Sequence, residues 1–164
     1  MKTSKIGIDL IKHFEGLHDG DLKVIGLQPK MDPIGIWTEG YGRAMRDSKG
    51  NFIKGLANKK LAYSRQTIKT ENEAALALAQ DLQVYENIVM RKITVPLKQQ
   101  QFDALVSHTY NTGGSNTLFS LVNKSTNSSD VRVWFETKYI SAAGVPLAGL
   151  VNRRKAEAKI YFYE

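Results

Sequence analysis

A glutamate near the start of the chain stands at a chemically unusual position. Ile6, Leu10 and Phe14 recur every four residues, which predicts one apolar stripe of a helix. Gly16 is a typical stop signal, so Glu15 would be the last side chain of that helix. The negative end of the helix macrodipole and the apolar Phe14 both disfavour the charged form of a carboxyl there. A glutamate that keeps its proton near neutral pH can act as a general acid.

A second carboxyl, Asp32, is expected in a different setting. Asp32-Pro33 followed by Ile34-Gly35 is a turn sequence, which predicts an ionised carboxylate close to water. Thr38 ends a short strand-like run, and its hydroxyl would point to the same face as Ile36. Alone, each feature has an ordinary explanation: a solvated helix end, a turn, a surface threonine. Together, one acid and one base are the groups that glycoside hydrolysis requires.

Three segments of the chain resemble a known family. Phe14-Glu15-Gly16 with the run 32–42 (DPIGIWTEGYG) is similar to the catalytic head of the phage-type lysozymes, glycoside hydrolase family twenty-four. These enzymes are endolysins of tailed bacteriophages and prophages. Residues 101–113 resemble the family's central helix, and residues 149–157 resemble its C-terminal helix. The motifs occur in the family's order and span most of the chain.

The resemblance implies a muramidase that hydrolyses peptidoglycan between N-acetylmuramic acid and N-acetylglucosamine, for lysis of the host cell. Glu15 would protonate the leaving oxygen, and Asp32, helped by Thr38, would orient and deprotonate the attacking water. The family likeness implies inversion at the anomeric carbon, for which the two carboxyls stand about 6.5–9.5 Å apart with a water between them.

The sequence departs from the family pattern at two places. The segment from His18 to Met31 is longer than expected, which predicts an extended loop or hairpin beside the cleft. Glu39 stands where the family has an apolar residue, commonly Ile.

Periodicity and turn signals predict a small β region followed by helices. Residues 17–60 are rich in Gly, Pro and Asp, with β-prone pieces at 22–25, 36–38 and 52–53 around a hairpin turn at 47–51. Thr70 and Glu73 form a capping box, from which a helix should run to about Arg91. Later helices are expected at 97–111, 117–122, 130–140 (capped by Asp130) and 150–162.

With the resemblance, these elements predict an α+β, mostly helical, lysozyme-like fold. Residues 1–164 would form a single catalytic domain of two lobes. A small antiparallel β lobe would cover about 15–60, and a helical lobe about 70–164 plus the N-terminal helix, with the long helix joining them.

Several further residues are candidates for substrate binding. An aromatic plane next to an amide, Tyr110-Asn111, suits stacking and hydrogen bonding to a sugar, although a core tyrosine and a helix cap would look the same. Arg43 follows the catalytic motif closely and is expected near the cleft. Arg153 and Arg154 are better explained as packing ion pairs with Glu157. His108 is expected to be a buried or rim side chain rather than a catalyst. Trp37 is expected to belong to the core of the β lobe rather than to form a sugar platform.

Composition narrows the function classes. The 164 residues include no Cys and three His, so disulfides, thiol catalysis and a zinc site are not expected. The reaction that the resemblance implies needs no metal or cofactor. The net charge of +7 favours polyanionic partners. Because the cations are scattered rather than in runs, we expect the bacterial wall, not nucleic acid, to be that partner.

Residues 1–12 contain Lys2, Lys5, Asp9 and Lys12, and lack the apolar run of a signal peptide or signal-anchor. The sequence therefore predicts a protein made in the host cytoplasm, without stable membrane association. We also expect it to be a monomer. It would depend on a separate membrane-opening, holin-like protein and act on the wall after release.

Two alternatives remain. A lytic transglycosylase needs a single acid/base glutamate and no water-activating carboxylate, so the presence of Asp32 and Thr38 argues against it. A non-catalytic basic module that binds the wall or nucleic acid would make the Glu15, Asp32 and Thr38 set a coincidence.

Overall fold

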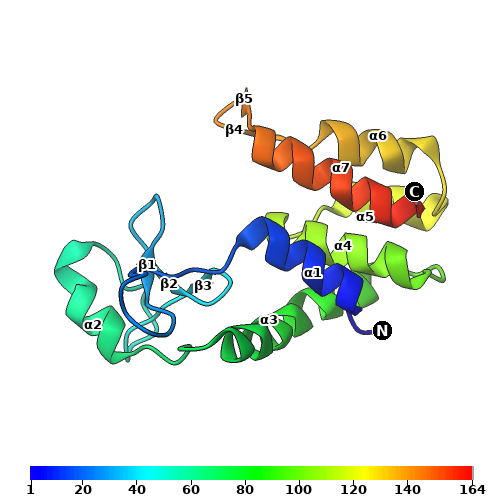
Figure 1. Ribbon diagram of the computed structural model, residues 1–164. Helices are drawn as coiled ribbons and strands as arrows, with labels where there is room; N and C mark the ends of the chain where they lie inside the picture. The colour runs from blue at the N-terminus through cyan, green and yellow to red at the C-terminus, as the bar shows by residue number, and fades with distance from the viewer. Residues whose placement is uncertain (164) are drawn as a thin grey trace. The chain divides into compact units, whose positions relative to one another are not determined.

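The computed structural model describes residues 1–163, which divide into two compact units (Figure 1). Residues 15–81 form one, called here the β unit, and residues 1–14 with 82–163 form the other, called the helical unit. Helix α3 (Glu71–Lys92) contributes its first half to the β unit and the rest to the helical unit. The helix ends one residue beyond the predicted end at Arg91. Its capping box is confirmed, because Thr70 Oγ1 accepts a hydrogen bond from Glu73 N and Glu73 Oε2 accepts one from Thr70 N.

The β unit is built on a three-stranded antiparallel sheet in the order β1-β2-β3. The strands are β1 (Lys30–Met31), β2 (Trp37–Glu39) and β3 (Arg43–Ala44), and they are followed by a short 3-10 turn, η1 (Leu56–Asn58), and helix α2 (Lys59–Ser64). The β unit has its own hydrophobic core. Its buried side chains are Trp37, Met45, Ile53 and Ala62, and the partly buried Met31 and Tyr63 pack against them. The assignment of Trp37 to the core is therefore confirmed.

The predicted strand at residues 22–25 is wrong. These residues form turns and bends, and the Ile25 side chain is fully exposed. Two aspartates explain the difference, because their carboxylates satisfy the backbone locally. Asp19 Oδ1 accepts from the backbone N–H groups of Asp21 and Gln28, and Asp21 Oδ1 accepts from Lys23 N. The β propensity of the aliphatic side chains therefore finds no neighbouring strand.

The hairpin turn at 47–51 is confirmed. Asp47 N donates to Asn51 O at 2.8 Å, and Gly50 has a φ of 85°, in the left-handed region that glycine adopts without strain. The strand predicted at 52–53 is reduced to an isolated bridge between Phe52 and Arg46.

Helix α4 (Gln99–Thr112) lies at the centre of the helical unit, with every residue from Gln101 to Thr109 buried. Helix α7 (Ala148–Phe162) packs against both α4 and α6 (Ser129–Thr137), as Figure 1 shows. The unit also contains α1 (Lys5–Glu15), α5 (Asn116–Lys124) and a two-stranded hairpin of β4 (Ser141–Ala142) and β5 (Val145–Pro146). No helix within residues 1–163 is long and apolar enough to cross a membrane.

One predicted helix cap is wrong. Helix α6 begins one residue before Asp130, and its N-cap is Ser128, whose Oγ accepts from Val131 N at 3.4 Å. Serine and aspartate both favour the N-cap position, and here Ser128 occupies it. Asp130 therefore lies in the first turn of the helix, where its negative charge also stabilises the helix.

The imidazole of His108 lies fully buried on α4, as predicted, and should make the fold sensitive to acid. Burial, together with the nearby cations Arg154 and then Arg153, lowers the pKa of His108 to about 3. Between about pH 6.5 and pH 3 the unfolded chain binds a proton that the folded chain does not. This group's contribution to stability is therefore lost as the pH falls, by up to about 1.4 kcal/mol per pH unit.

We expect the free energy of unfolding, measured with urea between pH 7 and pH 4, to fall less steeply in His108→Gln than in the unsubstituted protein. The glutamine variant will be less stable at pH 7, so the comparison concerns the slope and not the absolute value. Equal slopes in the two proteins would show that His108 does not control the acid response.

Candidate active site

Glu15 is the last residue of α1, as predicted, and the chain then turns through Gly16, whose φ is 71°. Its carboxylate lies beside the backbone of Gly42, where a Cβ would stand 3.8 Å from Glu15 Oε2. Gly42 has a φ of 86° and no side chain, so the strand end approaches the carboxylate closely without strain. Glu15 and Gly42, which come from the two parts of the motif, thereby lie together within the β unit.

Asp32 is held by the turn that its own sequence predicts. Its Oδ1 accepts hydrogen bonds from Ile34 N at 3.0 Å and from Ile36 N at 2.8 Å. The backbone closes the same turn, because Asp32 N donates to Ile36 O and Gly35 N donates to Asp32 O. Within residues 1–163 no hydrogen bond reaches Oδ2. The turn therefore fixes the carboxylate through one oxygen and leaves the other able to accept a proton.

Thr38 lies in the middle of β2 and is buried, with 4% of its surface exposed. Its hydroxyl donates to the backbone carbonyl of Lys30, the opposite residue on β1, at 2.8 Å. The same Oγ1 lies 2.6 Å from Nδ1 of His18. The hydroxyl is thus held in one orientation by two partners.

His18 is a residue of this site that the sequence did not reveal. Its backbone N–H donates to Gly40 O at 2.7 Å, which attaches the loop after α1 to the end of β2. Burial, and then the nearby Lys30 ammonium, lower the pKa of His18. A hydrogen bond to the Glu15 backbone and the charges of Glu15 and Asp32 oppose that shift. The imidazole therefore lies within the electrostatic reach of both candidate catalytic carboxyls.

The polar residue at position 39 has a structural explanation. Glu39 is buried, and its carboxylate accepts hydrogen bonds from Thr67 N at 2.9 Å, Thr67 Oγ1 at 2.7 Å and Ile68 N at 3.0 Å. Three donors offset the cost of removing a carboxylate from water. Glu39 thereby ties the segment before α3 to the sheet that carries Thr38.

Arg43, predicted to bind substrate, is bound to α3 within the β unit. Its Nε and Nη2 form a two-pronged ion pair with the carboxylate of Asp81, at 2.9 Å and 3.0 Å, and Nη2 also donates to Ala77 O. The guanidinium thus links β3 to α3, and its contact with substrate stays a prediction.

The other two predicted substrate contacts lie on α4 in the helical unit. The Tyr110 ring packs edge-to-face against Tyr85, with centroids 4.9 Å apart. Asn111 is exposed, and its Oδ1 accepts from Arg154 Nη2 at 3.0 Å. Asn111 is not the helix cap, because α4 ends at Thr112 and its C-cap is Gly113.

The packing interpretation of the two arginines on α7 is confirmed. Arg153 Nε lies 3.3 Å and Arg154 Nε 2.8 Å from the carboxylate of Glu157, and all three residues are buried. Ser107 Oγ donates to the same carboxylate at 2.7 Å.

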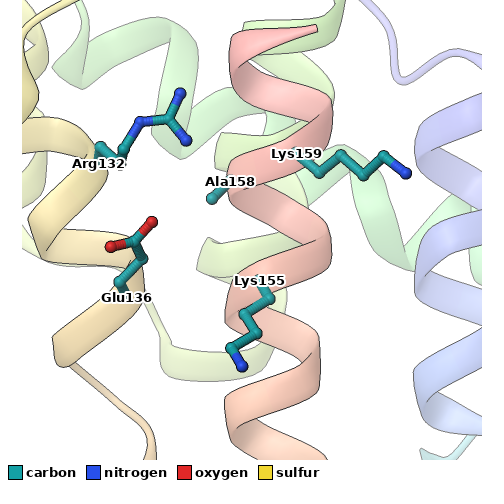
Figure 2. A pocket seen from close by; sticks show the side chains of 5 residues that line it. All are labelled: Arg132, Glu136, Lys155, Ala158 and Lys159. Atoms are coloured by element: carbon teal, nitrogen blue, oxygen red, sulfur yellow. The ribbon is translucent and has the colours of Figure 1, made fainter. Parts of the chain in front are cut away.

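A separate hollow of about 360 Å³ lies between α6 and α7 (Figure 2). Figure 2 shows the side chains that line it, which are Arg132, Glu136, Lys155, Ala158 and Lys159. It contains none of the predicted catalytic or substrate-binding residues.

Comparison with known proteins gives a consistent result. The profile of the phage lysozyme family matches residues 12–157. The endolysin of Acyrthosiphon pisum secondary endosymbiont phage 1 is 28% identical over 98% of each chain. The endolysin of Bacillus phage B103 is 30% identical over 98% of this chain but only 54% of its own length, so this chain spans about half of that relative.

Among solved structures, the endolysin of Escherichia coli phage FAHEc1 is similar with a TM-score of 0.71 and 30% identity, over 98% of this chain and 93% of that one. The predicted fold class, mostly helical α+β with a small antiparallel sheet, is confirmed. The family match covers most of the sequence, including all the candidate catalytic residues. This chain belongs to the phage lysozyme family.

Proposed function

We propose that the chain is an endolysin, a muramidase that hydrolyses the β-1,4 bond between N-acetylmuramic acid and N-acetylglucosamine in peptidoglycan. Family membership supports the reaction class. The observation that carries the assignment of residues is the environment of Asp32. Its Oδ1 is fixed by two backbone N–H groups, while no hydrogen bond from the described residues, 1–163, reaches Oδ2. A carboxylate held in this way is suited to accept a proton from water.

In the proposed mechanism Glu15 donates its proton to the glycosidic oxygen as the bond to the anomeric carbon breaks. Asp32 removes a proton from a water on the opposite face of the sugar, and Thr38 orients that water. Attack from the opposite face inverts the anomeric configuration. The reaction consumes one water, and the chain's own side chains supply both proton transfers.

We further propose that Tyr110 and Asn111 contact the glycan, by stacking and through the amide. Arg43 would help mainly by holding β3 against α3, since its guanidinium is already paired with Asp81. The net charge of +7 supports attraction to the anionic wall rather than to nucleic acid. The chain would act as a monomer, after a separate membrane-opening, holin-like protein gives it access from the cytoplasm.

The products test this proposal directly. We expect digestion of purified peptidoglycan to add one water per cleavage and to leave a reducing muramic acid end, because Asp32 activates a water. Mass spectrometry of the fresh products measures the added mass, and proton NMR shows which anomer forms first. An inverting enzyme acting on a β-linkage gives the α-anomer first.

The other possible products discriminate between the alternatives. Anhydro-muropeptides as the main product would replace hydrolysis by the lytic transglycosylase reaction. The β-anomer appearing first would retain hydrolysis but make Asp32 a nucleophile. Binding to the wall without any new reducing end would favour a non-catalytic module.

A further inference from the structure

The hydrogen-bonding capacity of Thr38 constrains how its neighbours can interact with it. A threonine hydroxyl has one proton to donate and two lone pairs that accept. The Lys30 carbonyl, 2.8 Å away, can only accept, so the hydroxyl proton is committed to it. His18 Nδ1 lies 2.6 Å from the same oxygen and must therefore be the donor in that contact. One lone pair of Oγ1 then remains.

We propose that His18 is a positioning residue of the hydrolase site, which donates from Nδ1 to Thr38 Oγ1 and so fixes this hydroxyl as an acceptor for one proton of the attacking water. This inference rests on the proposed function, in which Thr38 orients that water. The water would donate one hydrogen bond to Thr38 Oγ1 and the other to Asp32 Oδ2. This orientation turns a lone pair of the water oxygen towards the anomeric carbon.

The position of His18 supports the assignment, because it is fixed independently of the Thr38 contact. Its backbone N–H donates to Gly40 O at 2.7 Å, which anchors the residue without involving the ring. A Cβ at Gly42 would lie 3.8 Å from both Glu15 Oε2 and His18 Cε1, so the imidazole and the candidate general acid share one neighbourhood. His18 therefore connects the helix end that carries Glu15 to the strand that carries Thr38.

Two variants at this position separate hydrogen bonding from shape. His18→Leu removes the donor, and we expect it to lower kcat about tenfold with KM nearly unchanged, the effect of losing one oriented hydrogen bond. His18→Asn retains an N–H group at the distance of Nδ1, and should keep most of the activity. Initial rates on purified peptidoglycan measure both. His13→Leu, at an exposed histidine five residues earlier, is the matched control and should retain the full rate.

A double-mutant cycle shows whether His18 acts through Thr38. In a Thr38→Val background the hydroxyl is absent, so adding His18→Leu should cause no further loss of kcat. Circular dichroism and thermal unfolding of each variant establish that it is folded. ¹⁵N NMR of the imidazole in the unsubstituted protein gives a readout without any substitution, and should show the proton on Nδ1.

The inference is overturned by full activity in His18→Leu, by equal losses in the Asn and Leu variants, by additive losses in the Thr38→Val background, or by a ring protonated only on Nε2. These results would leave the hydrolase assignment standing as long as Glu15→Gln and Thr38→Val still lose activity. If instead Thr38→Val keeps the full rate, the proposed role of Thr38 fails and that of His18 fails with it.

Discussion

Glu15→Gln is expected to lower kcat by about 10²–10⁴-fold, the usual contribution of general acid catalysis, while the fold stays intact. The amide has almost the shape of the acid but cannot transfer a proton to the leaving oxygen. The substitution sits at the end of α1, beside Gly42, and removes no part of the apolar core. The fall in turbidity of chloroform-treated Gram-negative cells, together with release of reducing ends from purified peptidoglycan, measures the rate.

The matched control is Glu136→Gln, an exposed glutamate on α6 that removes the same charge outside the β unit. It corrects for the change in net charge, which alone could alter attraction to the wall. A Glu15→Gln protein with near-normal kcat would exclude Glu15 as the proton donor. A variant that binds peptidoglycan normally but does not cleave it would place the defect in the chemical step.

The parts of the site that could be predicted from the sequence are those set by local interactions. Glu15 ends its helix because Gly16 follows it, and Asp32 is fixed by backbone groups within four residues of it. The long helix α3 was predictable for the same reason, since Thr70 and Glu73 satisfy each other's backbone N–H groups at its start. In each case the contacts that determine the local structure join residues no more than four positions apart in the sequence.

Contacts between distant residues were not predictable. His18 reaches Thr38 across 20 residues because its backbone pairs with Gly40, and no local pattern indicates that pairing. Arg43 follows the catalytic motif in sequence, which favoured a substrate contact, yet its guanidinium binds Asp81, 38 residues further on. A residue's distance from a motif in sequence thus does not determine what its side chain contacts.

The aliphatic run at 22–25 shows a different failure. Its composition favours a strand, but the flanking aspartates Asp19 and Asp21 satisfy the backbone and hold a loop. Propensity scales do not contain this competition between side-chain and ladder hydrogen bonds, which operates wherever Asp residues flank a short apolar run.

Glu157→Gln is expected to destabilise the protein by about 3–5 kcal/mol, the typical cost of removing one partner from a buried ion pair. Glu157 and Arg154 are fully buried and Arg153 is 3% exposed. Burial raises the pKa of Glu157, and the two guanidiniums oppose that shift. The amide cannot balance two buried cations, and it replaces an oxygen that accepts from Ser107 or Arg154 with a donor.

Urea unfolding followed by circular dichroism measures this loss at pH 7. Lys155→Gln, an exposed charge on the same helix, is the control and should change stability by less than about 0.5 kcal/mol. If the cost arises from unbalanced charge, the double variant Arg154→Met with Glu157→Met should lose less stability than the sum of the two single variants. Each single substitution leaves the other residue of the pair buried and unpaired, whereas the double substitution removes both charges. Additive losses, or a Glu157→Gln protein within about 1 kcal/mol of the unsubstituted one, would show that the cluster is not coupled and that α7 is held to α4 by apolar packing alone.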